Sequence, residues 1–177
     1  MQKKLQNLCK KRDLCEIYSN VDDTSKFMVG YILSCNDNDI VLWLIDQYGH
    51  FDGICWLIMD EIYKIKTETK YLKACQKLIE YNNEQNVFDI NESSLKDMLK
   101  FAYDNKRICE IELSESDQVN DSGYIAEILS DKIIIKSVDE YGEFNGESII
   151  DIDMISCLIF DSQDMCKLEI LNKSNKK

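Results

Sequence analysis

Short apolar runs separated by polar, turn-forming residues dominate the chain, and the same order of runs occurs twice. Runs of this length bounded by Asn, Asp, Ser and Gly are typical of β-strands. The first set lies at residues 15–18, 27–34, 40–45, 54–58 and 62–65. The second set begins at Ile108 and ends at Ile159. The pattern therefore predicts five short strands in each half, with the second and third strands forming a hairpin.

The two halves are copies of one sequence. Three separated motifs recur at a constant spacing: Gly30-Tyr-Ile as Gly123-Tyr-Ile, Asp46 as Asp139, and Asp60-x-Ile as Asp153-x-Ile. Further upstream, Cys15-Glu-Ile recurs at Cys109, and here the spacing is one residue longer. This difference places a one-residue insertion or deletion in the polar stretch 20–26, where a loop tolerates it.

Helical periodicity occurs only outside the predicted strands. Tyr71, Leu72, Cys75, Leu78 and Ile79 form one apolar stripe, with Thr67 or Thr69 as the capping residue. In the second half, Ser94 and Asp97 have the spacing of a capping box ahead of a helix that ends near Lys106. The remaining helix predictions are a leading helix around Leu5, Leu8 and Cys9 and a shorter trailing helix from Ser162 to Leu171.

These elements predict a mainly β protein with flanking helices and two domains. We expect the first domain at residues 1–81 and a polar linker at 82–93. The second domain is expected at 94–171, followed by a disordered tail at 172–177. A chain of 177 residues is long enough for two small hydrophobic cores.

An eight-residue motif, Asp-x-Tyr-Gly-x-Phe-x-Gly, follows the third predicted strand in both copies and has two interpretations. As a structural turn, it uses Asp to bond the backbone and Gly to adopt positive φ, while its aromatic rings fill the end of the fold. The turn residues are Asp46, Gly49, Gly53, Asp139, Gly142 and Gly146. As an interaction surface, it presents its side chains to a partner. The residues of this surface are Tyr48, His50, Phe51, Tyr141 and Phe144.

The net charge of −12 is unevenly distributed. Residues 1–12 carry five cations and no acid, and residues 167–177 carry four cations and one acid, so the part between them is strongly acidic. An acidic surface repels phosphates, which disfavours nucleic acid as a ligand of the two modules. No stretch approaches the roughly 20 apolar residues of a membrane span, and the N-terminus lacks the features of a secretory signal. We therefore expect a cytoplasmic protein of bacterial origin, and the absence of proline together with heavy Lys, Asn and Ile usage suggests an AT-rich genome.

The sequence favours neither a metal site nor catalysis. The eight cysteines are scattered without a Cys-x-x-Cys pair, and His50 is the only histidine, so we expect no metal and no cofactor. Cys55 lies near His50, but the second copy has Ser148 and Glu143 at these positions. There is also no glycine-rich phosphate loop. The chain is therefore interpreted as a non-enzyme.

Three features of both copies resemble Sm-like proteins. These are the Gly-x-Ile of the second strand, the Ile-x-Leu or Ile-x-Ile of the third, and the apolar-x-x-Asp-x-Ile turn before the last. The residues are Gly30, Ile32, Gly123 and Ile125; Ile40, Leu42, Ile133 and Ile135; and Leu57, Asp60, Ile62, Ile150, Asp153 and Ile155. The resemblance implies two tandem five-stranded small barrels, each preceded by a helix; SH3-like barrels share this spacing. The residues with which Sm-like proteins hold RNA bases are not present, and the last turn is acidic instead.

These features lead to one main functional hypothesis and two alternatives. The main one is a non-catalytic interaction or scaffold protein that binds a protein partner or self-associates. The first alternative is RNA binding through the basic N-terminal segment, which contains Lys3, Lys4, Lys10, Lys11 and Arg12, or through the Lys-rich tail. The second is an acidic inhibitor of a nucleic-acid-binding protein. Residues 13–66 have a net charge of −7 and residues 108–166 one of −13, so an anionic ligand would bind the first copy.

Overall fold

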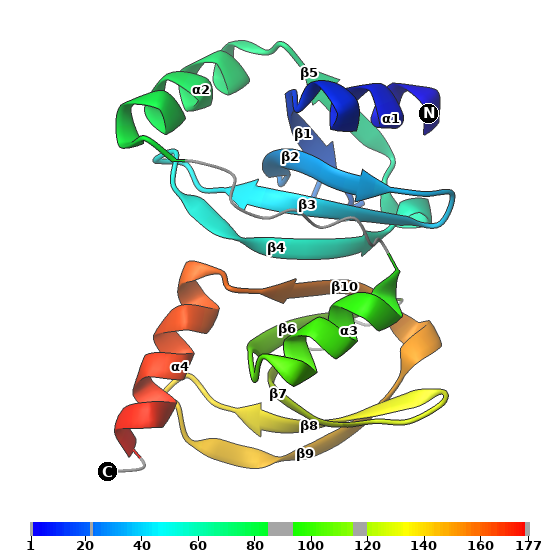
Figure 1. The fold of residues 1–177 in the computed structure, drawn as a ribbon, viewed down its shortest axis with the longest axis vertical. Helices are drawn as coiled ribbons and strands as arrows, with labels where there is room; N and C mark the ends of the chain where they lie inside the picture. Colours follow the sequence, from blue (N-terminus) through cyan, green and yellow to red (C-terminus); the bar gives the residue numbers. More distant parts are fainter. Residues whose placement is uncertain (1, 22, 85–93, 115–119, 176–177) are drawn as a thin grey trace. The chain divides into compact units, whose positions relative to one another are not determined.

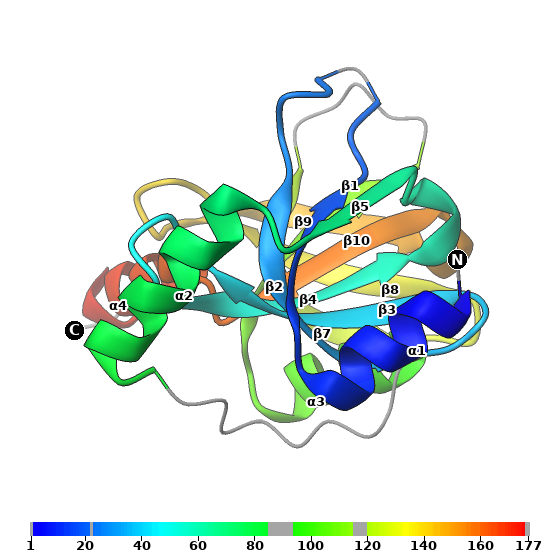
Figure 2. The same cartoon turned by 90° about the horizontal axis from the view of Figure 1, so that it is seen from above.

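The chain forms two compact units, residues 1–93 and 94–177, each built from a bent antiparallel sheet and two helices (Figures 1 and 2). The computed structural model describes residues 2–21, 23–84, 94–114 and 120–175. In these residues no helix is long and apolar enough to cross a membrane.

Unit 1 begins and ends with a helix. Its elements are α1 (Gln2–Lys11), β1 (Leu14–Tyr18), β2 (Met28–Cys35), β3 (Asp39–Ile45), β4 (Phe51–Ile58), a 3-10 turn η1 (Met59–Glu61), β5 (Lys64–Thr67) and α2 (Lys70–Asn82). The strands are ordered β5-β1-β2-β3-β4, and all neighbours are antiparallel. Figure 1 shows α1 and α2 above the layer of β2, β3 and β4, and Figure 2 shows α2 toward the left and α1 toward the lower right of the unit.

Unit 2 repeats this order. Its elements are α3 (Leu95–Asp104), β6 (Ile108–Leu113), β7 (Asp121–Ile128), β8 (Lys132–Val138), β9 (Phe144–Asp151), a 3-10 turn η2 (Ile152–Met154), β10 (Ile155–Phe160) and α4 (Gln163–Asn175). The strands are ordered β10-β6-β7-β8-β9, again antiparallel. The order of strands, helices and 3-10 turn is therefore the same in the two units.

The duplication extends to irregular details of the backbone. The register shift between β2 and β3 at Ile32 recurs between β7 and β8 at Ile125. Residues with left-handed backbone also recur: Arg12 and Lys106 follow the leading helices, and Glu68 and Asp161 precede the trailing ones. Non-glycine residues rarely adopt positive φ. Their recurrence at matching positions shows that both copies keep one backbone path while their side chains differ.

Each sheet is open in the described residues, because no ladder joins β4 to β5 or β9 to β10. The expected closed barrels are thus not confirmed, although the mainly β architecture with flanking helices is. In unit 1 only residues 59–63 connect the two outer strands, which forces the sheet to curl until its edges approach one another. The register shifts contribute to this curl, since a β-bulge bends its strand and increases its twist.

The interior of each unit is filled by alternate strand residues and by the leading helix. The most deeply buried side chains of unit 1 are Leu5, Ile17, Ile32, Ile40, Leu42 and Ile54, and those of unit 2 are Leu99, Ile108, Ile111, Ile133, Ile135 and Phe160. Alternation is clearest in β8, where Ile133 and Ile135 point inward between partly exposed neighbours. A strand with one face on the interior shows this period of two.

Of the two capping residues expected for α2, Thr69 is the cap, with its hydroxyl accepting from Leu72 N at 3.1 Å. Two sequence expectations need correction. First, β5 lies at residues 64–67 instead of 62–65, because η1 occupies the preceding positions. Second, α4 continues to Asn175 and equals α2 in length, so the shorter helix ending at 171 is wrong. The expected tail is therefore helical up to residue 175; most of the expected linker 82–93 lies outside the described residues.

Candidate functional site

The repeated motif forms the same turn in both units. Asp46 Oδ1 accepts hydrogen bonds from the backbone N–H groups of Tyr48 and His50, both at 2.8 Å. In unit 2, Asp139 Oδ1 accepts from Tyr141 at 3.0 Å and from Glu143 at 2.9 Å. The aspartate thereby satisfies backbone donors that face no strand partner. The second half of the motif, from Phe51 or Phe144, is the start of β4 or β9.

The turn packs directly against the trailing helix of its own unit. Gly49 and Gly142 have positive φ of 83° and 80°, and a Cβ atom at either position would lie within 2.6 Å of a helix side chain, Leu78 or Leu171. Gly53 and Gly146 also have positive φ. Side-chain amides on the helices complete the contact. They are Asn82 Nδ2 to Tyr48 O at 2.9 Å, Asn172 Nδ2 to Gly142 O at 2.9 Å and Asn175 Nδ2 to Tyr141 O at 3.2 Å. The motif therefore joins the β3–β4 or β8–β9 corner to a helix.

The aromatic residues of the motif have different environments. Tyr48 and Tyr141 are 65% and 69% exposed and Phe144 is 52% exposed, so they do not fill the end of the fold. Phe51 instead packs on Trp43 at a ring-centroid distance of 5.6 Å. His50 is half exposed, and its Nδ1 lies 3.1 Å from Glu84 Oε1. Exposure of the tyrosines and Phe144 is compatible with the interaction surface expected from the sequence.

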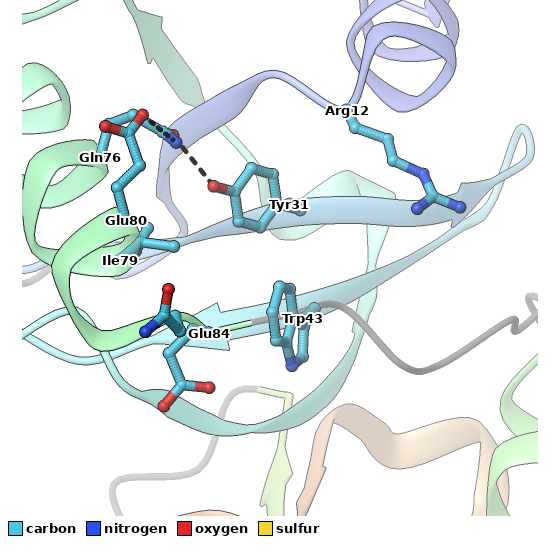
Figure 3. Close-up of a pocket in the computed structure, with 8 residues that line it drawn as sticks. Arg12, Tyr31, Trp43, Gln76, Ile79, Glu80 and Glu84 are labelled. Atoms are coloured by element: carbon cyan, nitrogen blue, oxygen red, sulfur yellow. Dashed lines mark hydrogen bonds between the residues drawn. The ribbon is translucent and has the colours of Figure 1, made fainter.

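A pocket of about 370 Å³ lies beside this turn in unit 1 (Figure 3). It is bounded by α2, by β2 and β3, and by the residue that follows α1. The lining residues are Arg12, Tyr31, Trp43, Gln76, Ile79, Glu80, Asn83 and Glu84. Figure 3 shows the side chains of α2 on one side of the two aromatic rings and Arg12 on the other. The pocket thus has an acidic and amide-rich side and a single basic residue.

Hydrogen bonds and ring stacking order the interior of this pocket. Tyr31 OH donates to Gln76 Oε1 at 3.0 Å, and Gln76 Nε2 donates to Glu80 Oε1 at 3.2 Å. Tyr31, from β2, stacks on Trp43 at a ring-centroid distance of 5.5 Å, and Phe51, from β4, packs on the same indole at 5.6 Å. Burial, with a smaller contribution from the nearby Glu80 charge, raises the pKa of Tyr31, whereas the hydrogen bond that Tyr31 donates to Gln76 acts in the opposite direction. Tyr31 therefore stays a neutral donor, and the pocket offers an apolar wall beside carboxylate and amide acceptors.

The second copy lacks this lining. Trp43 corresponds to Lys136, Gln76 to Glu169 and Glu80 to Lys173. In unit 2 the last two form an ion pair, with Lys173 Nζ 3.1 Å from Glu169 Oε2. Unit 2 keeps Tyr124 at the position of Tyr31, but it has no indole there and its acid is paired with a lysine, although both units share one backbone path.

A second cavity in unit 1, of about 430 Å³, lies between α1 and the first half of α2. Its lining is mostly polar and includes Lys4, Asn7, Lys11, Asp13, Thr67, Glu68, Lys73 and Gln76, with Leu8, Leu14 and Leu72 at the base. Gln76 borders both cavities. One helix, α2, thus carries residues of two differently charged sites.

The cysteines do not form a reactive or metal-binding cluster in the described part of the chain. Cys55 is fully buried, and its Sγ lies 3.9 Å from Met28 Sδ and 3.5 Å from Trp56 O. Burial raises the pKa of Cys15 to about 12 and raises that of Cys109 as well. A thiol nucleophile needs a lowered pKa. Among the described residues, no three His, Cys, Asp or Glu side chains are placed to hold a metal ion.

The sequence alone did not reveal the two cavities, because their linings come from segments far apart in the chain. Two signals were present. Gln76, Glu80 and Glu84 recur at the spacing of one helix face, and the residue that corresponds to Trp43 in the second copy is a lysine. Comparison with known proteins gives no significant match to a family model, a curated protein or a solved structure.

Proposed function

We propose that this protein is a non-catalytic interaction protein built from two Sm-like small barrels, and that unit 1 binds a basic segment of a protein partner. The observation that carries the proposal is the pocket of unit 1, where acids and amides of α2 and of the residues just after it stand beside the buried Trp43 and the partly buried Tyr31. The strand order and the leading helix of each unit support the Sm-like assignment.

The chemistry of the pocket favours a cationic side chain as its occupant. Ile79 and the aromatic rings can cover the aliphatic stem of a lysine or arginine, while Glu80 and Glu84 receive the charged end. Arg12 lies on the far side of Tyr31 from these acids (Figure 3), and among the described residues neither acid forms an ion pair with a lysine or arginine; Glu84 lies 3.1 Å from His50 Nδ1. The acidic net charge of the chain then attracts a basic partner and speeds its association.

The test is affinity purification from native cells, with both proteins and nucleic acids identified, using wild-type protein and two charge-reversal variants. Glu80→Arg changes the pocket, whereas Asp37→Arg makes the same charge change at an exposed turn outside it. We expect one protein partner with a basic binding segment, lost with Glu80→Arg and kept with Asp37→Arg. The proposal would be overturned if both variants lose the partner equally, or if no recovered protein binds one variant and not the other.

RNA binding is the second candidate, and the cavity between α1 and α2 favours it because three lysines line that cavity. Nucleic-acid binding requires such cations to neutralise phosphates. Purified protein should then carry absorbance at 260 nm or shift oligo-U or oligo-A at low salt. Absence of both effects would exclude this candidate.

Self-association through strand edges is the remaining form of the interaction hypothesis. One outer strand of each unit is charged: β5 carries Lys64 and Lys66, and in β9 Glu147 and Asp151 pair with lysines of β8. Charged residues at an edge discourage pairing with another chain. We therefore favour a monomer that binds a partner, and sedimentation at high concentration separates this from a ring of several copies.

A further inference from the structure

Three lysines converge on the cavity between α1 and α2. Lys4 and Lys11 come from α1 and Lys73 from α2, and all three are exposed. None of them forms an ion pair with a carboxylate of the described residues, although Asp13 and Glu68 line the same cavity. Three lysines around a cavity that holds two acids leave a local excess of positive charge.

The position of the cavity at the start of α2 strengthens this charge. The N-terminal end of a helix is its positive end and is stabilised by acids or bound anions. The first turn of α2 contains no acid and instead carries Lys70 and Lys73, whereas the first turn of α4 contains Asp164. Cations at this end are unfavourable in isolation, and an anion bound between them would relieve the repulsion.

In unit 2 the positions that correspond to the cavity lining carry side chains that pack against one another. Phe101 and Phe160, at the positions of Asn7 and Thr67, stack at 5.5 Å. Met98 takes the place of Lys4 and is buried. Asp13 and Glu68 correspond to Arg107 and Asp161, whose Nε and Oδ1 are 3.2 Å apart. The second copy is thus packed with rings and one ion pair where the first is open and polar.

The two acids of the cavity narrow the class of ligand. A bare phosphate would meet the lysines but would be repelled by Asp13 and Glu68. A ligand with both a phosphate and hydroxyl or amino groups can satisfy all five charged residues, because carboxylates accept hydrogen bonds from such donors. Nucleotides combine these groups, and so does the backbone and base of a single-stranded nucleic acid.

We propose that the cavity between α1 and α2 of unit 1 is a binding site for a nucleotide-type ligand. The phosphate is held by Lys4, Lys11 and Lys73, and the hydroxyl or amino groups donate to Asp13 and Glu68. This site is separate from the acidic pocket to which we assign the protein partner, and it does not depend on that assignment.

The test measures the affinity of AMP, ATP, inorganic phosphate and oligo-U for the full chain at low salt, by calorimetry. The Lys11→Gln, Lys73→Gln double variant should weaken nucleotide binding at least tenfold. The matched control is Lys10→Gln, Lys77→Gln, which removes two lysines of the same helices that do not line the cavity. It should change the affinity less than threefold. Equal weakening by the two double variants would indicate general charge attraction and would overturn the proposal.

A second variant tests the cavity without changing charge. Asn7→Phe introduces the ring that unit 2 carries at this position, and we expect it to abolish binding of AMP and ATP while the thermal unfolding curve keeps its midpoint. Unchanged affinity in Asn7→Phe would contradict the site. Tighter binding of oligo-U than of AMP, lost in the lysine double variant, would identify the ligand as a nucleic-acid strand; the reverse order identifies a free nucleotide.

Discussion

The contact between the repeated turn and the trailing helix can be measured by replacing two glycines of unit 2. Gly142 and Gly146 have nearly equal positive φ, 80° and 86°. A left-handed backbone costs an L-residue about 1–2 kcal/mol, so alanine at either position should destabilise the fold by about this amount. At Gly146 a Cβ would meet nothing within 4 Å. The Gly146→Ala variant therefore isolates the backbone term.

Gly142→Ala adds a steric term to the same backbone term. Its Cβ would lie 2.5 Å from Leu171 Cβ and 2.7 Å from Asn172 N, so α4 must move. Overpacking of this kind costs about 1–3 kcal/mol. Movement of α4 also weakens the hydrogen bond from Asn172 Nδ2 to Gly142 O, worth about 1 kcal/mol. We expect Gly142→Ala to be less stable than Gly146→Ala by about 2–4 kcal/mol.

The assay is urea unfolding of the two full-length variants followed by far-UV circular dichroism. Tryptophan fluorescence provides an internal reference, because both tryptophans, Trp43 and Trp56, belong to unit 1. The variants should shift the circular dichroism transition by different amounts. If Gly142→Ala is as stable as Gly146→Ala, the turn does not pack on α4 as described and the reasoning fails.

Three further predictions follow from single contacts. Thr69→Val removes the cap of α2 and the hydrogen bond from Thr69 Oγ1 to the buried Glu16. The free energy of unfolding of unit 1, measured with urea, should therefore fall by about 2–4 kcal/mol. A fall below about 0.5 kcal/mol would contradict these two hydrogen bonds. Iodoacetamide with mass spectrometry should label the exposed Cys166 in the native protein and leave the buried Cys109 unlabelled until unfolding, and equal labelling would refute the packing of unit 2. Burial raises the pKa of Asp161, so the stability that its protonated form contributes is present below its unfolded pKa of about 3.9 and is lost as pH rises through the folded pKa. The Asp161→Asn variant should therefore gain stability relative to wild type as the pH rises through this window. A stability difference that does not change with pH would contradict the raised pKa.

Strands and helices were predictable because each has its own periodicity. The five strands of each copy came from short apolar runs, and α3 came from the cap at Ser94 and the stripe that follows it. The duplication helped, because a strand that is weak in one copy is clear in the other. The end of α4 was missed for a physical reason. Its last turn contains Asn172, Ser174 and Asn175, polar residues typical of a frayed end, but two of their amides bond the turn around Gly142.

Site geometry was harder to predict than the fold. The exposure of Tyr48 and Tyr141 depends on how the turn meets the helix, and no local pattern distinguishes an exposed ring from a buried one. Phe51, which has the same sequence context as Phe144, is drawn onto Trp43, and the second copy has Lys136 there. Phe144 instead lies 6.4 Å from Tyr124 between ring centroids and is 52% exposed, so the same motif position has different surroundings in the two copies.

The two copies have diverged in side chains and not in backbone, and this separates structural residues from functional ones without any other protein for comparison. The turn aspartates, the glycines with positive φ and the helix amides occur in both units, as expected of residues that hold the fold together. The linings of the two cavities differ at almost every position. Where unit 2 has rings and ion pairs, unit 1 has lysines at the start of α2 and acids at its end. These differences in the linings are what the binding sites proposed for unit 1 would explain, whereas the shared residues are explained by the fold.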